Sequence, residues 1–152
     1  MGIADDAVEV RSEGWRTLAA LHALIDEALE RALQQESKLS VVEFTVLDAL
    51  SRQPGTWHLR MQQLSRATAL SASATTRLVS RLEQRGLITR VLCLDDRRGI
   101  YTELTAAGAD LLSRTRPAHD RALESALEAA RNVPELAPLV AVLPNLLVST
   151  RD

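Results

Sequence analysis

The chain has 152 residues with a net charge of −2, and 46% of its residues are hydrophobic, 25% are charged and 3% are aromatic. This composition is typical of a globular domain with a core, and it excludes a disordered chain, a collagen-like chain and a disulfide scaffold. The single cysteine cannot form an internal disulfide, and the few aromatic side chains argue against a stacking platform for single-stranded nucleic acid.

The first predicted element is a long helix over residues 12–35, with Ser12 as its cap. Its apolar residues cover more than one side of the helix, and such a helix needs more than one packing partner. In so short a chain the additional partner is often a second subunit. The first helix therefore predicts a homodimer.

A second helix is predicted to begin at Ser40, because Ser40 and Glu43 have the spacing of a capping box. This helix ends before Pro54. A short extended segment over residues 56–60 and a third helix over residues 61–67 follow.

A turn over residues 68–71 separates the third helix from a fourth. The fourth helix is capped by Ser71 or Ser73, and Gly86 is a natural residue to end it. Two helices joined by a short turn predict a helix-turn-helix.

Beyond Gly86 the apolar residues follow the two-residue period of strands. Two strand-like runs, residues 87–94 and 100–104, flank a polar turn that ends in a glycine, and this pattern predicts a β-hairpin. A hairpin after a helix-turn-helix is the layout of a winged helix-turn-helix. We place this winged part at residues 40–105.

The C-terminal part is predicted to be helical. Thr105 caps a helix over residues 106–131, in which Pro117 is expected to cause a kink. The expected fold is mainly α with a small β-hairpin wing, in one domain over residues 1–152. In this fold the helices at 12–35 and 106–149 form the dimer.

A final leucine-rich helix is expected after Pro134, which can occupy its first turn. Pro138 fits that first turn poorly, and Pro144 falls in the middle of the helix. These three prolines leave open whether the last element is continuous and how it contributes to the dimer.

Positive charge is concentrated in the winged part. Residues 52–101 hold nine arginines and three acids, a net charge of +6, whereas the rest of the chain holds nine bases and 17 acids, a net charge of −8. A GC-rich genome would explain the choice of arginine over lysine, but not the scarcity of acids in this segment. The asymmetry predicts a face that binds a polyanion.

The fourth helix carries the candidate face for reading DNA. Ala74, Leu78 and Leu82 recur every four residues and mark its core side. The opposite side has short hydroxyls, an arginine and an amide, which let a helix approach the floor of the major groove. The candidates for base reading on that side are Ser73, Thr76, Arg77, Ser80 and Gln84. A solvated polar face is the alternative interpretation.

Further arginines are predicted to contact the DNA backbone, and these are Arg52, Arg66, Arg81 and Arg85. At the hairpin tip, Arg98 is expected to enter the minor groove, with Asp96 holding its guanidinium and Arg97 assisting. An ordinary surface turn is the alternative for this tip, because aspartate and glycine are common turn residues.

Three stretches resemble the MarR family of bacterial winged-helix regulators: LSVVEFTVLDAL (39–50), MQQLSRATALSASATTRLVSRLEQRGLITR (61–90) and DDRRGIYTELTAAG (95–108). The resemblance implies a homodimer that places one recognition helix in each half of a pseudo-palindromic operator. It also implies a base-reading role for Thr75, beside Ser73, Thr76 and Arg77, although the helical spacing turns Thr75 toward the core.

The resemblance further implies release from DNA by a small, often aromatic ligand bound between the dimer helices and the winged part. The residues expected to line that junction are Trp15, His22, Phe44 and Trp57. Plain packing or surface exposure is the alternative for each of them.

Other chemistries have weaker support. Cys93 lies on a predicted wing strand, where a redox-sensing thiol and a small hydrophobe are both consistent with the sequence. The histidines lack the paired spacing of metal ligands, so no metal or cofactor is expected. No phosphate loop or nucleophile elbow is present, so no catalytic residue is expected.

The N-terminal acids Asp5, Asp6 and Glu9 stand where a signal peptide carries positive charge, and no apolar run approaches the roughly 18 residues of a membrane span. We therefore expect a cytoplasmic regulator that binds double-stranded DNA, with repression as its expected effect. A winged-helix adaptor for another protein is the remaining alternative, although its fourth helix would present an apolar or acidic face.

Overall fold

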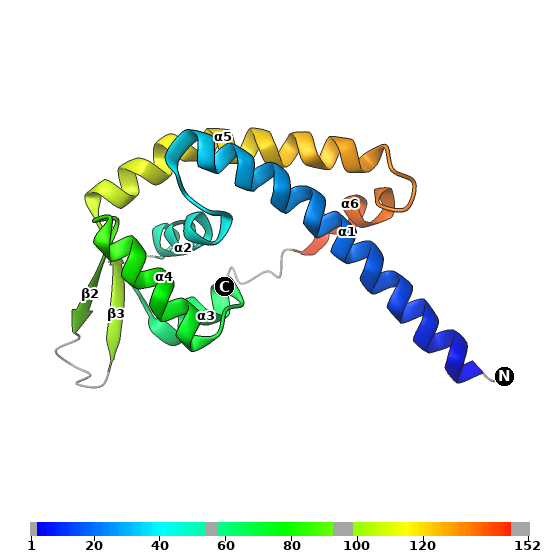
Figure 1. Ribbon diagram of the computed structural model, residues 1–152, viewed down its shortest axis with the longest axis horizontal. Helices are drawn as coiled ribbons and strands as arrows, with labels where there is room; N and C mark the ends of the chain where they lie inside the picture. Colours follow the sequence, from blue (N-terminus) through cyan, green and yellow to red (C-terminus); the bar gives the residue numbers. More distant parts are fainter. Residues whose placement is uncertain (1–2, 54–57, 93–98, 147–152) are drawn as a thin grey trace. The chain divides into compact units, whose positions relative to one another are not determined.

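The computed structural model describes residues 3–53, 58–92 and 99–146. Within these ranges the chain is mostly helical and has a small antiparallel sheet, which confirms the predicted fold class (Figure 1). The chain divides into two compact units. Unit 1 comprises the residues before 33 and after 118, and unit 2 comprises residues 33–118.

Unit 2 contains the winged part. Its elements are α2 (Val41–Ser51), β1 (His58–Arg60), α3 (Met61–Thr68), α4 (Ala72–Gln84), β2 (Ile88–Leu92) and β3 (Ile100–Leu104). The strand order is β1-β3-β2, and both pairs are antiparallel. Thr102 in the central strand lies opposite Leu59, and its side-chain hydroxyl donates a hydrogen bond to the Leu59 carbonyl at 3.0 Å. The end of the segment predicted only as extended therefore forms β1, an edge strand of the sheet.

Local signals in the sequence position the helices of unit 2. Ser40 Oγ accepts from the backbone N of Glu43 at 3.1 Å, and Glu43 Oε1 accepts from the backbone N of Ser40 at 3.4 Å, which confirms the capping box. Ser71 caps α4 by accepting from the backbone N of Ala74 at 3.2 Å. Gly86 has a φ of +73° just beyond α4, a conformation that favours glycine.

An apolar core fixes the orientation of α3 and α4 within unit 2. Leu64 of α3 and Leu78 and Leu82 of α4 are buried in it, together with Leu47 and Leu50 of α2. Because these leucines fix the inward side of α4, the side that carries the polar residues faces solvent.

Unit 1 is built from helices. The long helices α1 (Ile3–Ser37) and α5 (Ala106–Arg131) each contribute residues to both units, and unit 1 also holds α6 (Ala137–Val142) and the 3-10 helix η1 (Leu143–Leu146). Its core consists of Leu21, Ala130, Leu136 and Val140, and it joins α1 to the end of α5 and to α6.

Two predicted helix boundaries are wrong. α1 begins at Ile3, so Ser12 lies inside the helix and does not cap it. Alanine and glutamate among residues 4–9 favour a helix, and the acids there suit the positive end of its dipole. The last helix begins at Ala137 rather than at Pro134, and Pro138 lies in its first turn, where a missing N–H breaks no helical hydrogen bond.

Other features of the C-terminal part agree with the sequence. Thr105 Oγ1 accepts from the backbone N of Gly108 at 3.0 Å and so caps α5. Pro144 lies in η1, which interrupts the last element as expected. Pro117 lies inside α5, and the kink expected there stays a prediction. None of the helices in the described ranges is both long and apolar enough to cross a membrane.

Candidate nucleic-acid interface

The exposed side of α4 is polar and positively charged. On the core side of this helix, the side chains of Leu78, Val79 and Leu82 are buried. On its other side, four of the residues predicted to read bases are exposed: Ser73, Thr76, Arg77 and Gln84. The structure therefore presents hydroxyl, guanidinium and amide groups together along one helix face.

Thr75 does not belong to this face. Its side chain is fully buried, and its Oγ1 lies 2.9 Å from the hydroxyl of Ser65 on α3 and donates to the carbonyl of Ser71 at 2.9 Å. The base-reading role that the family resemblance implied for Thr75 is therefore wrong in this structure. Thr75 instead joins the two helices of the helix-turn-helix.

Arg90 of β2 extends over the exposed side of α4. Its Nη2 donates to Ser80 Oγ at 2.6 Å, and the Ser80 hydroxyl donates to the carbonyl of Thr76 at 2.9 Å. The backbone N of Arg90 also donates to Glu83 Oε2 at 3.2 Å. Arg90 therefore adds a second guanidinium to the face that carries Arg77.

The sequence alone identifies Arg90 only as part of the basic segment over residues 52–101. Alternation along a strand was the signal that could have identified it, because Arg90 stands two residues after the buried Ile88 and so lies on the same side of β2. Ser80, predicted to read bases, is half-buried and is hydrogen-bonded to Arg90.

The guanidinium of Arg85 forms hydrogen bonds with other residues of unit 2. It donates to the carbonyls of Ser37 and Lys38, each at 3.1 Å, and its Nη1 lies 3.4 Å from Glu43 Oε2. These donors are directed at the end of α1 and the start of α2, and the predicted role of Arg85 as a DNA backbone contact stays a prediction.

The remaining predicted backbone contacts are exposed. Arg66 lies in the last turn of α3 and Arg81 in the last turn of α4. Arg52 follows α2, and its Nε donates to Asp48 Oδ2 at 2.7 Å. Arg66 and Arg81 are therefore the better placed of the three for phosphate, since Arg52 already has a carboxylate partner.

Asp48 joins α2 to α5 within unit 2. Its Oδ1 lies 2.6 Å from Arg116 Nη1, and its other oxygen accepts from Arg52. Partial burial raises the pKa of Asp48, but hydrogen bonds from Arg52 and Arg116 and their positive charges outweigh burial, so the pKa lies below its ordinary value. The cluster is therefore an ion-paired link at neutral pH.

Two hollows flank α4. One, of about 190 Å³, is lined by Met61, Gln62, Ser65, Ala72, Thr76, Arg90 and Ile100. The other, of about 240 Å³, is lined by Ser40, Val42, Leu70, Ala74, Arg77, Leu78 and Arg81. The exposed side of α4 is therefore accessible along both of its edges.

Several predicted site residues lie outside the described ranges: Trp57, Cys93, Asp96, Arg97 and Arg98. Of the other residues expected to line a ligand pocket, Trp15 and His22 are exposed in unit 1, and Phe44 is buried in the core of unit 2. The predicted pocket therefore stays a prediction.

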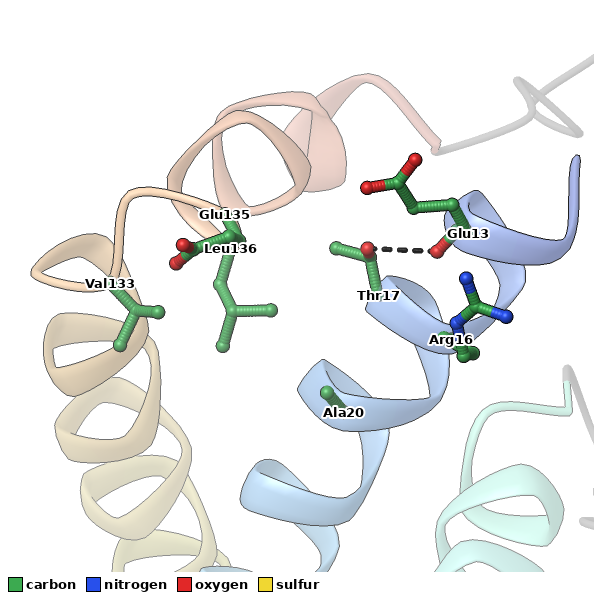
Figure 2. Close-up of a pocket in the computed structure, with 7 residues that line it drawn as sticks. All are labelled: Glu13, Arg16, Thr17, Ala20, Val133, Glu135 and Leu136. Atoms are coloured by element: carbon green, nitrogen blue, oxygen red, sulfur yellow. Dashed lines mark hydrogen bonds between the residues drawn. The ribbon is translucent and has the colours of Figure 1, made fainter. Parts of the chain in front are cut away.

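Unit 1 has a pocket of its own, which no pattern in the sequence predicted. It has a volume of about 380 Å³ and is lined by Glu13, Arg16, Thr17, Ala20, Val133, Glu135 and Leu136 (Figure 2). The Thr17 hydroxyl donates to the backbone carbonyl of Glu13 at 3.0 Å, a hydrogen bond within α1 that Figure 2 shows as a dashed line.

The described residues contain no group of three or more His, Cys, Asp or Glu that could hold a metal ion.

Comparison with known proteins identifies relatives of this chain. Residues 37–99 match the model of the MarR family. The HTH-type transcriptional regulator PecS of Dickeya dadantii (strain 3937) is 33% identical over 103 residues, which are 68% of this chain and 61% of PecS. The matched part of this chain therefore spans less than two thirds of the length of PecS.

Two crystal structures of Streptomyces coelicolor proteins share the fold. Sco3205, a MarR family transcriptional regulator crystallised in complex with DNA, has a TM-score of 0.71 and 28% identity, over 93% of this chain and 89% of Sco3205. AbsC, also a MarR family transcriptional regulator, has a TM-score of 0.72 and 28% identity, over 87% of this chain and 88% of AbsC. The similarity extends over nearly the whole fold.

Proposed function

We propose that this chain, which resembles the MarR family, regulates transcription by binding specific sequences in double-stranded DNA. The observation that carries the proposal is the exposed side of α4. It combines Arg77 and Gln84 with short hydroxyls and lies opposite the leucines of the core. Arginine pairs with guanine and glutamine with adenine in the major groove.

The proposed contacts divide into two classes. Ser73, Thr76, Arg77 and Gln84 read base edges, and Ser80 supports the face through Arg90. Arg66 and Arg81 attract backbone phosphates, which gives affinity without sequence preference. At the wing tip we retain Arg98 for the minor groove, with Asp96 and Arg97 beside it, on the strength of the sequence.

We propose that the DNA-binding form is a homodimer. Unit 1 exposes large apolar side chains on α1, with Val10 67% exposed, Trp15 66% and Leu18 48%. At the other end of the chain, Val142 and Leu146 are 45% and 64% exposed. Such surfaces are typical of an interface between subunits. In a two-fold dimer the two α4 helices read half-sites about 10 bp apart on a pseudo-palindrome.

We further propose that the bound dimer represses transcription and that a small aromatic ligand weakens its hold on DNA. A ligand that binds the DNA-free form more tightly than the DNA-bound form would shift the population away from DNA. The expected lining residues are Trp15, His22, Phe44 and Trp57.

Selection of random duplex DNA on the purified protein, followed by a salt titration of the selected duplex, tests the proposed function. We expect a palindromic motif and an affinity that falls steeply with salt, because several arginines contact phosphate. A variant with both Arg66→Gln and Arg81→Gln should select the same motif more weakly. Absence of an enriched motif at moderate salt would contradict sequence-specific binding.

A further inference from the structure

Arg85 stands at the junction of three helices. It is the residue that ends α4, and its side chain is 36% exposed. The neighbouring arginine on the same helix, Arg81, is exposed to solvent. Two arginines four residues apart on the recognition helix therefore have different surroundings.

The guanidinium of Arg85 lies next to the C-terminal end of α1 and donates hydrogen bonds to its carbonyls. α1 ends at Ser37, and Lys38 then adopts a left-handed backbone with a φ of 58°. Nη2 donates to the carbonyl of Ser37 and Nη1 to that of Lys38, each at 3.1 Å. Carbonyls at a helix end lack partners within the helix and carry the negative end of its dipole. α1 has no basic residue in its own last turn, so Arg85 supplies the positive charge from α4.

The same guanidinium also contacts the start of α2. Nη1 lies 3.4 Å from Glu43 Oε2, and Glu43 uses its other oxygen to accept from the backbone N of Ser40 in the capping box. The Glu43 side chain is 13% exposed, whereas that of Arg85 is 36% exposed, so the carboxylate is the more buried partner of this pair. One side chain thus holds together the end of α1, the start of α2 and the end of α4.

We propose that Arg85 is a positioning residue for DNA binding. It fixes the direction of α4 against the C-terminal end of α1 and the start of α2, and it supports specific affinity through the orientation of the recognition helix rather than through a contact with phosphate. This inference rests on the proposed function, since it assigns a role in the same binding event.

The chemistry of the contact predicts which substitutions preserve it. Arginine directs several donors in a fixed plane, whereas lysine carries a compact charge on a flexible stem. Arg85→Lys therefore retains the positive charge but cannot bridge two carbonyls and a carboxylate in the same way. A phosphate contact would largely survive this change, but a positioning contact would not.

The test measures affinity for the selected duplex across a salt series. For Arg81→Gln, the matched control, the slope of log affinity against log salt should become shallower by about 0.9 because one phosphate contact is lost. For Arg85→Gln we expect an unchanged slope and an affinity reduced by roughly tenfold. Arg85→Lys should show most of that reduction. Circular dichroism checks that each variant retains the helical content of the unmodified chain.

A double-mutant cycle with Glu43→Gln gives a second readout. Glutamine preserves the capping box but removes the charge that faces Arg85. If Arg85 acts by positioning, the effects of Arg85→Gln and Glu43→Gln on DNA affinity should not add. The first substitution already removes the contact between the two side chains, so the second one has less left to remove. A phosphate contact by Arg85 would give additive effects within roughly twofold.

The outcomes separate this inference from the proposed function. A shallower slope for Arg85→Gln, an unchanged affinity or additive effects would overturn the positioning role and leave specific DNA binding intact. Failure of the unmodified chain to select any duplex would overturn the proposed function and the inference with it.

Discussion

At the scale of single residues, Arg77 and Arg81 lie one turn apart on α4 and are both exposed, but we expect them to act differently. Arg77→Ala should reduce affinity for the selected duplex by about 1–3 kcal/mol and relax the base preference at one position. Arg81→Ala should weaken binding to selected and random duplexes alike. Titrations with both duplexes make the comparison. An equal loss on both duplexes for Arg77→Ala would contradict its base-reading role.

Asp48 gives a residue-scale prediction for pH. Its pKa is lowered in the folded protein, so the link to Arg52 and Arg116 contributes stability above the unfolded pKa of about 3.9 and loses it as the pH falls through the folded pKa. Asp48→Asn should lower the free energy of unfolding at neutral pH by about 1–2 kcal/mol, between the values for exposed and buried pairs. The difference from the unmodified chain should shrink below about pH 4.

Urea denaturation across this pH range measures the effect of Asp48→Asn. Asp110→Asn serves as the control, because Asp110 forms an exposed pair with Arg114 on one helix and its loss should cost about 0.5 kcal/mol or less. Equal and small effects for the two variants would show that the Asp48 cluster adds nothing beyond a surface pair.

Thr75 and Arg85 show which side-chain positions could be predicted from the sequence and which could not. The four-residue spacing of Ala74, Leu78 and Leu82 identified the inward side of α4, and the same spacing turned Thr75 inward, where the structure has it. The family resemblance gave the opposite assignment for Thr75. The partners of Arg85 could not be predicted, because Ser37 and Lys38 are 48 and 47 residues away in the sequence. Such contacts depend on how the helices pack.

At the scale of elements, two glycines in the described helices predict opposite effects of the same substitution. A Cβ on Gly108, in the first turn of α5, would overlap the backbone oxygen of Leu87 and lie 2.8 Å from Leu104 Cδ1. A Cβ on Gly14 in α1 would meet nothing within 4 Å. Gly108 therefore marks a close approach of α5 to the start of the wing, whereas Gly14 has no such constraint.

Gly108→Ala should destabilise the fold by about 1–3 kcal/mol because backbone atoms must shift to accommodate the methyl group. Gly14→Ala should stabilise it by about 0.5–1 kcal/mol, since alanine favours a helix over glycine. Thermal denaturation of the two variants under identical conditions makes the comparison. A shift of both melting temperatures in the same direction would contradict the close approach at Gly108.

Elements with local signals were predicted well, and those without them were not. The capping serines Ser40 and Ser71 placed two helix starts, because a cap is a contact between residues three apart. The start of α1 was missed because Ser12 also resembles a cap, although helical residues precede it. The pairing of β1 with β3 could not be predicted, because His58 and Glu103 are far apart in the sequence.

At the scale of the whole molecule, the central claim is that two chains place two α4 helices on one face of DNA. The apolar side chains on α1 support a dimer, and the polar side of α4 supports base reading. Neither feature alone establishes that the two recognition helices act together. Their joint action requires a fixed distance between half-sites, close to one helical turn.

The most direct test measures affinity for the selected duplex with inserts between its half-sites. An insert of 5 bp turns one half-site by about half a helical turn, to the opposite face of the DNA. We predict that this insert reduces affinity to about that of a duplex with a single half-site, because only one α4 can then reach its bases. An affinity for the 5-bp insert equal to that of the selected duplex would contradict a dimer that reads two half-sites at once.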